Sequence, residues 1–527
     1  MQSVIRFFNR FPALIALALG ALAALGFAPW HVWPLTLAGL IGLLHMLSRM
    51  PASAASNLTY WRIGFAFGLG HFFVMLLWIP ETFHFQDAMP VWYGWPALAL
   101  LSAFLACYPA IAIRSALWIG GDRPLPLTVA MAGCWAIAEM LRAILFTGFA
   151  WNPIGIAMVD AALPARWIGS YGLSALLVLT AGGLWLLLQR QWRSGTAIFV
   201  PLVLLWTGSW LMLSGKLPFA EPADYGTDIR LTVVQNNIGQ DVDWTDPIVL
   251  ARNRESLLRL SRDIAPDDPR PRILFWSEGV VNDPLEDGYP EYFAAPNEAR
   301  AWRSLFTSPL RPQDLLITGG VKFEFDDRPR LKSARNSVFA IDGMGRMVAS
   351  YDKFHLVPYG EYLPFASLLG PLGLDKLTEG TVPYTPGPGP RSLNLGPFGK
   401  VGIQVCYEII FSGETIDRND RPDFMFNPST DDWFGRLGPP QQLEQARLRA
   451  IEENLPVIRA TPTGISAVID RHGAVRASIA WHEEGRIDTA LPPAGEPTLF
   501  SRLGYIAPAS LSLLLLLIAV ALRRRHR

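Results

Sequence analysis

Long apolar segments dominate the first 217 residues of the chain and return once near its end. A helix of roughly 20 apolar residues spans the hydrocarbon core of a bilayer. Seven such runs occur, at 11–28, 31–48, 62–80, 94–119, 125–148, 169–189 and 195–214, and an eighth lies at 503–522. Arg6 and Arg10 before the first run are typical of a signal peptide, but six more runs follow, which favours a retained anchor. The pattern predicts a multi-pass α-helical membrane domain of about eight spans.

The intervening segment has a different pattern, with short apolar strands separated by amphipathic helices. Strands are expected at 229–234, 272–276, 314–320, 337–342, 346–352, 400–408, 423–429, 456–461 and 464–470, and helices at 246–262, 297–306 and 439–454. Tight turns such as ID-GMG-RM and ID-RHG-AV predict hairpins among β-α-β units. The segment is therefore expected to form an α+β or α/β sandwich with a mixed sheet. The Gly- and Pro-rich stretch 371–398 is expected to be a long loop that serves as a lid.

Charge follows the same division, although the formal net charge of the 527 residues is zero. Residues 1–217 hold 11 Lys and Arg against 5 Asp and Glu, residues 218–502 hold 30 against 40, and residues 503–527 hold 4 against none. With 51% hydrophobic and 17% charged residues, disorder and nucleic-acid binding are disfavoured. The expected domains are a membrane domain of seven helices at 1–217, a polar domain at 218–495, an eighth helix at 503–522 and a basic tail at 523–527.

Arginines in the short loops predict the orientation, since cytoplasmic loops retain positive charge. With the N-terminus inside, the inner segments hold Arg6, Arg10, Arg49, Arg62, Arg114, Arg123, Arg190, Arg193 and four arginines of the C-terminal tail. The outer loops hold Arg166. The polar domain is therefore expected outside the cytoplasm, with both termini inside.

Among the three cysteines, Cys107 and Cys134 lie in apolar runs and Cys406 lies alone in the polar domain. No disulfide framework or CxxC pair is present. Cys406 ends the apolar stretch GIQVC, where a strand-to-helix turn exposes one side chain and directs backbone N–H groups towards its target. It is either such a nucleophile or a small buried hydrophobic residue.

Glu278 and Lys353 also follow expected strands. Glu278 comes just after Phe275 and Trp276, which would desolvate its carboxylate and raise its proton affinity towards that of a general base; the alternative is a surface glutamate. Lys353 opens a rigid turn that contains Pro358 and Gly360. There it can face a developing oxyanion, or it is simply a solvated lysine. Glu361 is placed to pair with it.

Three local sequences carry a resemblance to a known family: FWSEG around Glu278, YDKFHLVPYGEYLP around Lys353 and GIQVCYEIIF around Cys406. Their order resembles the Glu-Lys-Cys triad of the nitrilase (carbon-nitrogen hydrolase) superfamily. Together with the apolar spans, the chain resembles over nearly its whole length the apolipoprotein N-acyltransferases, the membrane-embedded branch of that superfamily. The resemblance implies an αββα sandwich for the polar domain.

The same resemblance implies the roles of the site residues. Cys406 would take an acyl chain from a phospholipid as a thioester, Glu278 would act as general base, and Lys353 would stabilise the tetrahedral oxyanion. Glu361 matches a supporting glutamate, and the residues that follow the nucleophile match as Tyr407 and Glu408. Trp244 matches a family tryptophan near the substrate entrance.

The resemblance further implies the partners and the location. The donor would be a phospholipid, with phosphatidylethanolamine expected, and the acceptor the α-amine of a diacylglyceryl-cysteine on an apolipoprotein. The expected location is the bacterial inner membrane, with the polar domain in the periplasm. No cofactor is expected. His45, His71 and His84 show no metal-ligand spacing, so no metal is expected either.

Other interpretations remain open at this point. A transporter would need polar residues in several spans. A non-catalytic lipid-binding or scaffold protein would normally have lost one member of the triad, and all three remain. A membrane-bound amidase would be separated only by a test of the acceptor. Glu139 and Arg142, three residues apart in the fifth span, form either a structural ion pair or a contact to a phospholipid headgroup.

Overall fold

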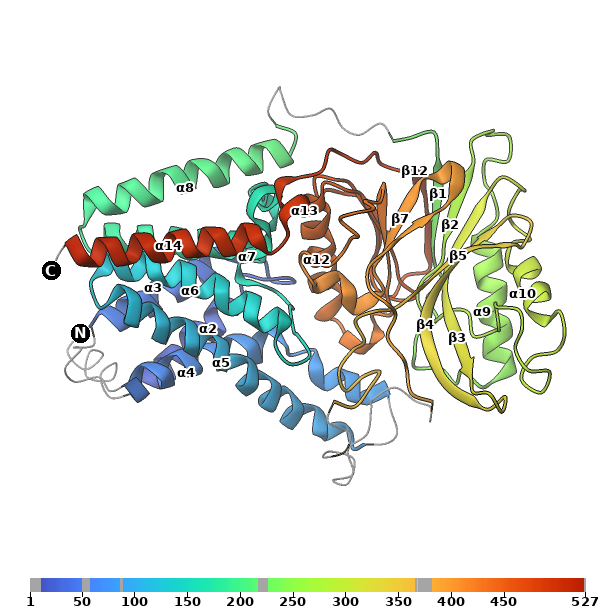
Figure 1. The fold of residues 1–527 in the computed structure, drawn as a ribbon, viewed down its shortest axis with the longest axis horizontal. Coiled ribbons are helices and arrows are strands. Elements are labelled where there is room, and N and C mark those ends of the chain that lie inside the picture. Colours follow the sequence, from blue (N-terminus) through green and yellow to red (C-terminus); the bar gives the residue numbers. More distant parts are fainter. Residues whose placement is uncertain are drawn as a thin grey trace. The chain divides into compact units, whose positions relative to one another are not determined.

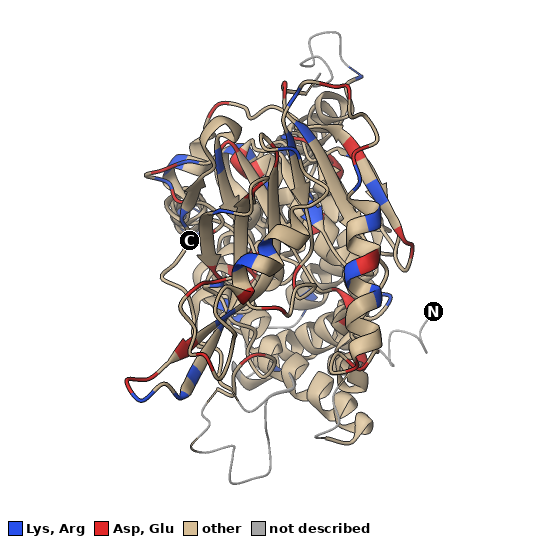
Figure 2. Ribbon diagram, turned by 90° about the vertical axis from the view of Figure 1, so that its right-hand side faces the viewer, with Lys and Arg blue, Asp and Glu red and all other residues tan. Residues whose placement is uncertain are grey.

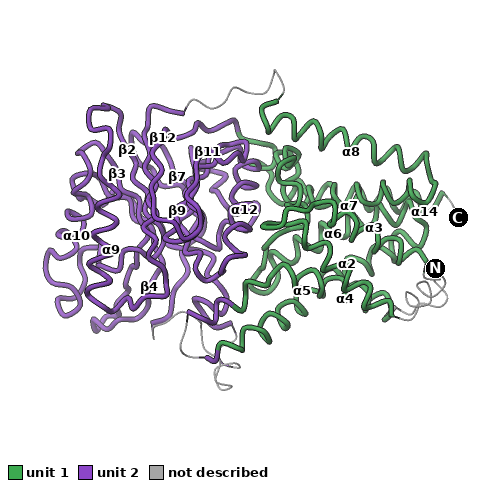
Figure 3. Tube along the Cα trace, turned by 180° about the vertical axis from the view of Figure 1, so that it is seen from behind, with its two compact units in different colours: residues 1–80, 91–220, 497–527 green, residues 81–90, 221–496 purple. Residues whose placement is uncertain are grey.

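The computed structural model describes residues 11–49, 57–85, 89–216, 226–364, 367 and 382–525. The chain divides into two compact units. Unit 1 contains residues 1–80, 91–220 and 497–527, and unit 2 contains residues 81–90 and 221–496 (Figure 3). Positions of Lys, Arg, Asp and Glu occur along the strands, helices and loops of unit 2 (Figure 2). Of the expected lid at 371–398, residues 371–381 lie outside the described residues, and the described remainder is not all loop, because residues 392–394 form a strand of unit 2.

Unit 1 is helical, with a helix at each of the eight apolar runs. Its long helices are α2 (Pro12–Ala24), α3 (Trp33–Arg49), α4 (Asn57–Met75), α5 (Gly94–Gly120), α6 (Pro124–Ile144), α7 (Ala165–Leu188), α8 (Trp192–Leu213) and α14 (Ile506–Arg525). Within the described ranges, five helices are long and apolar enough to cross a membrane, or six if the bent pair 58–75 and 79–85 forms one span. The expected membrane character is confirmed, whereas the count of eight spans stays a prediction.

Glycines let two of these helices approach closely. A Cβ atom added to Gly20 of α2 would lie 1.9 Å from the carbonyl oxygen of Phe67 in α4, and one added to Gly70 of α4 would lie 2.0 Å from that of Leu17. Small residues permit such backbone contact where helices lack a hydrophobic driving force to associate. Larger residues at either glycine would separate α2 from α4.

The charged pair of the fifth span makes structural contacts inside unit 1. Glu139 Oε1 accepts bonds from Trp135 Nε1 at 3.0 Å and from the Ile154 backbone N–H at 2.7 Å. Arg142 Nη1 donates to the Trp151 carbonyl oxygen at 2.7 Å. Both side chains are buried. They connect α6 to the segment after it, which supports the structural interpretation.

Unit 2 contains two six-stranded sheets. The first has the order β12-β1-β2-β3-β4-β5 and the second β11-β10-β9-β8-β7-β6. Their bounds are β1 (Arg230–Gln235), β2 (Arg272–Phe275), β3 (Leu315–Phe325), β4 (Leu331–Asp342), β5 (Met347–Asp352), β6 (Ser392–Asn394), β7 (Lys400–Ile403), β8 (Phe424–Pro428), β9 (Val457–Ala460), β10 (Ser466–Ile469), β11 (Val475–Ile479) and β12 (Gly485–Ala490).

The sheets face each other and carry helices on their outer sides. Phe275 of β2 contacts the rings of Phe424 and Phe426 of β8, with centroids 6.2 and 4.9 Å apart. Helices α9 (Pro247–Leu260) and α10 (Glu298–Phe306) pack on the first sheet through Leu257 and Phe306, and α12 (Gly438–Glu453) lies beside the second (Figure 1). The mixed sandwich expected from the sequence is observed.

The strand directions determine where a site can form. β1, β2 and β3 are parallel neighbours, as are β7, β8 and β9. The hairpins β3–β4 and β4–β5 are antiparallel, so β5 again runs with β3. Carboxyl ends of parallel strands share one edge of a sheet, which is where α/β folds bind ligands. Glu278, Lys353 and Cys406 follow β2, β5 and β7 at these edges.

Candidate active site

Cys406 lies in a strained turn rather than in the expected strand. Strand β7 ends at Ile403, and Cys406 opens the 3₁₀ helix η6 (Cys406–Ile410) with a φ of +48°. A residue with a Cβ atom rarely adopts this left-handed conformation, which costs about 1–2 kcal/mol. Such strain persists where the surrounding structure determines it, as in a nucleophile turn. The residue as a whole is 5% exposed.

Glu278 is buried in a cluster of polar groups. Its Oε1 accepts bonds from Asn336 Nδ2 at 2.7 Å and from Lys353 Nζ at 3.4 Å, and its Oε2 accepts the Thr430 backbone N–H at 2.8 Å. A carboxylate has roughly four lone-pair sites, so one remains for a proton. The two rings expected to desolvate the Glu278 carboxylate point elsewhere. Phe275 faces the second sheet, and the ring of Trp276 packs on that of Phe306 with their centroids 5.6 Å apart.

Lys353 lies between two carboxylates. Its Nζ is 3.0 Å from Glu361 Oε1 and 3.4 Å from Glu278 Oε1, and Asn336 Nδ2 bonds to both of these oxygens. Burial alone would lower the pKa of Lys353, but the two carboxylates outweigh it and raise the pKa. The lysine is therefore a permanent cation. Among the described contacts, its third N–H remains available to a substrate oxygen.

Glu408 connects the loop that follows Lys353 to the turn that contains Cys406. Its Oε1 accepts bonds from the backbone N–H groups of Phe354 and His355 at 2.7 and 3.1 Å and from Tyr351 Oη at 3.0 Å. Its Oε2 accepts the Val405 N–H at 2.7 Å. Burial raises the pKa of Glu408, although these N–H groups lower it. This carboxylate fixes the residues next to Lys353 and Cys406 in one arrangement.

Tyr407 and Trp244 occupy different surroundings. Tyr407 is buried, and its ring meets that of Phe411 edge-on at 5.2 Å. Trp244 is half-buried in the loop after β1, where its indole N–H donates to the Gly239 carbonyl oxygen at 3.2 Å. The next residue, Gln240, donates its backbone N–H to Asp432 Oδ2 at 2.7 Å. The Trp244 loop is thus joined to the segment that follows β8.

That segment, residues 429–432, contributes site groups that the sequence analysis did not identify. Thr430 donates its backbone N–H to Glu278 Oε2, and the Ser429 hydroxyl, which lies beside Asp431 and Gln442, opposes the effect of burial by lowering the pKa of the Cys406 thiol. Asp432 is buried, which raises its pKa to about 7. Asn336 of β4 is a further missed residue. The segment follows the carboxyl end of a parallel strand, which is the kind of position that identified Glu278. Asn336 lies inside a strand, so its position in the sequence did not distinguish it.

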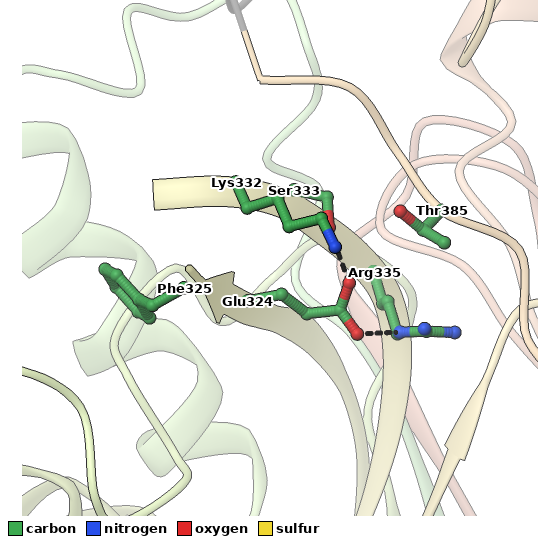
Figure 4. A pocket seen from close by; sticks show the side chains of 6 residues that line it. All are labelled: Glu324, Phe325, Lys332, Ser333, Arg335 and Thr385. Atoms are coloured by element: carbon green, nitrogen blue, oxygen red, sulfur yellow. Dashed lines mark hydrogen bonds and ion pairs between the residues drawn. The ribbon is translucent and has the colours of Figure 1, made fainter. Parts of the chain in front are cut away.

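A polar groove of about 530 Å³ lies apart from this cluster, at the far end of the β3–β4 hairpin (Figure 4). Glu324 there accepts bonds from Ser333 Oγ at 2.5 Å and from Arg335 Nε at 2.7 Å. Successive residues of a strand point to opposite faces, so Arg335 and its neighbour Asn336 serve different sides of β4. None of the six lining residues bonds to Glu278, Lys353 or Cys406 among the described contacts.

The pH dependence of Cys406 alkylation follows from its surroundings. Burial first, and then the Glu278 carboxylate, raises the pKa of the thiol to about 12 against the opposing effect of Lys353. At pH 7 about one molecule in 10⁵ carries a thiolate, and the thiolate is the reactive form. We expect the rate of alkylation by iodoacetamide to rise about tenfold per pH unit from pH 7 to 10, measured by mass spectrometry of the Cys406 peptide. A plateau below pH 9 would contradict this expectation.

Comparisons with known proteins agree with the two-part organisation. The family described as "Apolipoprotein N-acyltransferase N-terminal domain" matches residues 19–183, and that described as "Carbon-nitrogen hydrolase" matches residues 294–495. An apolipoprotein N-acyltransferase of Rhodopseudomonas palustris is 32% identical over 532 residues, covering 97% of this chain and 95% of the relative. One of Bradyrhizobium diazoefficiens is 34% identical over 552 residues, covering 98% and 96%.

Solved structures match about half of the chain. Nit3 of Saccharomyces cerevisiae, a member of branch 10 of the nitrilase superfamily, covers 50% of this chain and 90% of its own, with 17% identity and a TM-score of 0.35. An amidase from Nesterenkonia sp. covers 51% and 91%, with 15% identity and a TM-score of 0.33. The full-length sequence matches show that this chain belongs to the apolipoprotein N-acyltransferase family.

Proposed function

We propose that this chain transfers an acyl chain from a phospholipid, through a thioester on Cys406, to the α-amine of the diacylglyceryl-cysteine of an apolipoprotein. One observation carries the proposal: a buried Glu278–Lys353–Cys406 cluster occurs in a chain whose apolar helices and polar unit together match apolipoprotein N-acyltransferases over nearly their whole length. A phospholipid donor, with phosphatidylethanolamine expected, explains why a nitrilase-like unit is joined to membrane helices.

In the first step Glu278 accepts the thiol proton while the sulfur attacks the ester carbonyl carbon. Because the pKa of the thiol is about 12, proton removal accompanies the attack instead of preceding it. The carbonyl oxygen becomes an oxyanion, which the free N–H of Lys353 stabilises. Collapse of the intermediate breaks the C–O bond, and the lysophospholipid oxygen takes the proton from Glu278. The products are an acyl thioester and a lysophospholipid.

In the second step the neutral α-amine of the acceptor attacks the thioester carbon. Lys353 again offsets the charge on the oxygen, and Glu278 accepts a proton from the attacking nitrogen. Collapse breaks the C–S bond, the amide forms, and the proton returns to the sulfur. Two-step covalent catalysis thus replaces one ester-to-amide exchange by two easier steps. Water must be kept from the thioester meanwhile; we assign this to the loop around Trp244.

The donor half of the reaction is tested by mass spectrometry of Cys406 after incubation of the full-length protein with phospholipid vesicles and no acceptor. We expect a mass increase equal to one acyl chain on the Cys406 peptide and none on the Cys107 peptide. Adding a diacylglyceryl peptide with a free α-amine should remove that mass and acylate the peptide. Release of free fatty acid with no acylated peptide would instead identify a hydrolase.

The role of Glu278 is tested one step at a time with Glu278→Gln, which keeps the size and hydrogen bonding of the side chain but cannot accept the proton. We expect both thioester formation and aminolysis to slow by about 100-fold or more. A thioester loaded onto Cys406 from an activated acyl donor and mixed with a diacylglyceryl peptide isolates the second step. Release at the unmodified rate would show that Glu278 is not the base for aminolysis.

We further propose eight membrane spans, an inner-membrane location, a periplasmic unit 2 and cytoplasmic termini, since arginines gather in the loops assigned to the inside. Reporter domains active only outside or only inside the cytoplasm, fused at residue 300 and after residue 527, test this. The fusion at residue 300 should be active outside and the C-terminal fusion inside. Cytoplasmic activity at residue 300 would contradict the orientation and exclude a lipoprotein acceptor on the outer side.

A further inference from the structure

We propose that Gln442 donates a hydrogen bond from its side-chain amide to the sulfur of Cys406 and stabilises that sulfur when it is anionic, and that Arg459 is a positioning residue which orients this amide. In the proposed mechanism Lys353 acts on the substrate oxygen and Glu278 on the proton, whereas Gln442 donates directly to the sulfur. The inference deepens the proposed function, on which its catalytic meaning rests.

The contacts of Gln442 assign its amide orientation. Gln442 lies on α12 and is fully buried. Its Oε1 accepts bonds from Ser429 Oγ at 3.0 Å and from Arg459 Nη2 at 2.9 Å. A guanidinium group has no acceptor, so the amide atom facing it must be the oxygen. The amide nitrogen therefore faces the other way, where Nε2 lies 4.0 Å from Cys406 Sγ.

Arg459 is itself held from several sides. Its Nη2 contacts both carboxylate oxygens of Asp431 at 2.6 Å, its Nη1 donates to Asn427 Oδ1, and its Nε donates to the Ile465 carbonyl oxygen at 3.2 Å. Arg459 and Asp431 are fully buried. A buried ion pair with these bonds cannot reorient without leaving a charge unpaired. The guanidinium is thus a fixed donor that prevents the Gln442 amide from flipping.

The bond to sulfur is expected to strengthen during the reaction. At rest the sulfur is a neutral thiol, a weak acceptor, and a donor distance of 4.0 Å fits a weak contact. Charge develops on sulfur when the thiol proton leaves and again when the thioester breaks. Hydrogen bonds to charged groups are stronger than those to neutral ones, and interactions stronger in the transition state accelerate the step. Gln442 would therefore act on both halves of the transfer.

The test measures the reactivity of Cys406 without any lipid. Two variants of the full-length protein are compared with the unmodified chain for alkylation by iodoacetamide from pH 7 to 10, read by mass spectrometry of the Cys406 peptide. Gln442→Leu removes the donor, and we expect alkylation about tenfold slower at each pH. Gln442→Glu keeps an acceptor for Arg459 and Ser429 but turns an anionic oxygen towards the sulfur, so we expect at least as large a decrease.

A third variant probes the positioning role of Arg459. Arg459→Lys keeps a positive charge beside Asp431 but loses the planar fork, and we expect alkylation about threefold slower because the amide is no longer held in one orientation. An unmodified rate in this variant would remove the positioning role from Arg459.

The matched control is Gln235→Leu. Gln235 is another fully buried glutamine of unit 2, and its amide bonds to Ala480, Glu483 and Ser466 rather than to the site. We expect Gln235→Leu to lower thermal stability while Cys406 keeps its alkylation rate. If either Gln442 variant alkylates at the unmodified rate or faster, Gln442 has only a structural role. A failure of Cys406 to take an acyl chain from phospholipid would overturn the proposed function and leave this measurement intact.

Discussion

Cys406→Ser is expected to abolish acyl transfer while the protein remains folded. The burial that raises the pKa of the thiol to about 12 makes a serine hydroxyl, a weaker acid, still harder to deprotonate. The oxygen is also smaller than sulfur and would withdraw from the amide of Gln442. Transfer from radiolabelled phospholipid to a diacylglyceryl peptide, measured with purified protein in detergent, should fall below detection.

The control for this variant is Cys107→Ser in α5. Cys107 is half-buried, and its sulfur contacts the Ala103 carbonyl oxygen at 3.7 Å, a contact that a serine hydroxyl reproduces. This variant should transfer acyl chains at the unmodified rate. Turnover by Cys406→Ser at a rate close to that of Cys107→Ser would remove Cys406 from the mechanism.

Lys353→Met is expected to slow thioester formation by about 100- to 1,000-fold, the usual cost of losing one oxyanion stabiliser. Methionine keeps the length of the side chain but removes its charge. The change also leaves Glu278 and Glu361 facing each other across Asn336 without a cation, and an unpaired buried charge typically costs 3–5 kcal/mol of stability. Loss of activity in this variant alone would therefore not distinguish chemistry from unfolding.

The double variant Lys353→Met with Glu361→Gln separates these effects. It removes one negative charge together with the positive one, so the thermal stability should recover relative to Lys353→Met. Thioester formation, followed as acyl mass on the Cys406 peptide, should remain about 100-fold or more below that of the unmodified protein. Recovery of the rate together with stability would show that Lys353 has a structural role only.

Much of unit 2 could be predicted because its strands are short apolar runs bounded by turn residues. The hairpins around GMG and RHG form as β4–β5 and β10–β11. Strands β6 and β12 were not predicted, and β11 was expected only as the second arm of the RHG hairpin. β12 has mostly polar or half-buried residues, and it is a strand because it pairs with β1. Long-range pairing of this kind leaves little local signal in the sequence.

The candidate site was predictable only in part. Glu278, Lys353 and Cys406 could be found because each follows a strand, and the structure brings Glu278 and Lys353 into contact and within electrostatic range of Cys406. Asn336 and Arg459 are polar residues within strands, so their pattern does not distinguish them from surface positions. Their roles depend on which strands are neighbours, and this is decided by the tertiary fold.

At position 406 the backbone is left-handed, so the residue that the proposed chemistry requires is not the residue that would give the highest stability. Glycine adopts a positive φ without a Cβ penalty, so Cys406→Gly should relieve about 1 kcal/mol that Cys406→Ala retains. The inactive glycine variant would then unfold at a higher temperature than the equally inactive alanine variant. Selection for stability alone would drive this position away from cysteine. Its presence at +48° therefore supports the nucleophilic role proposed for Cys406.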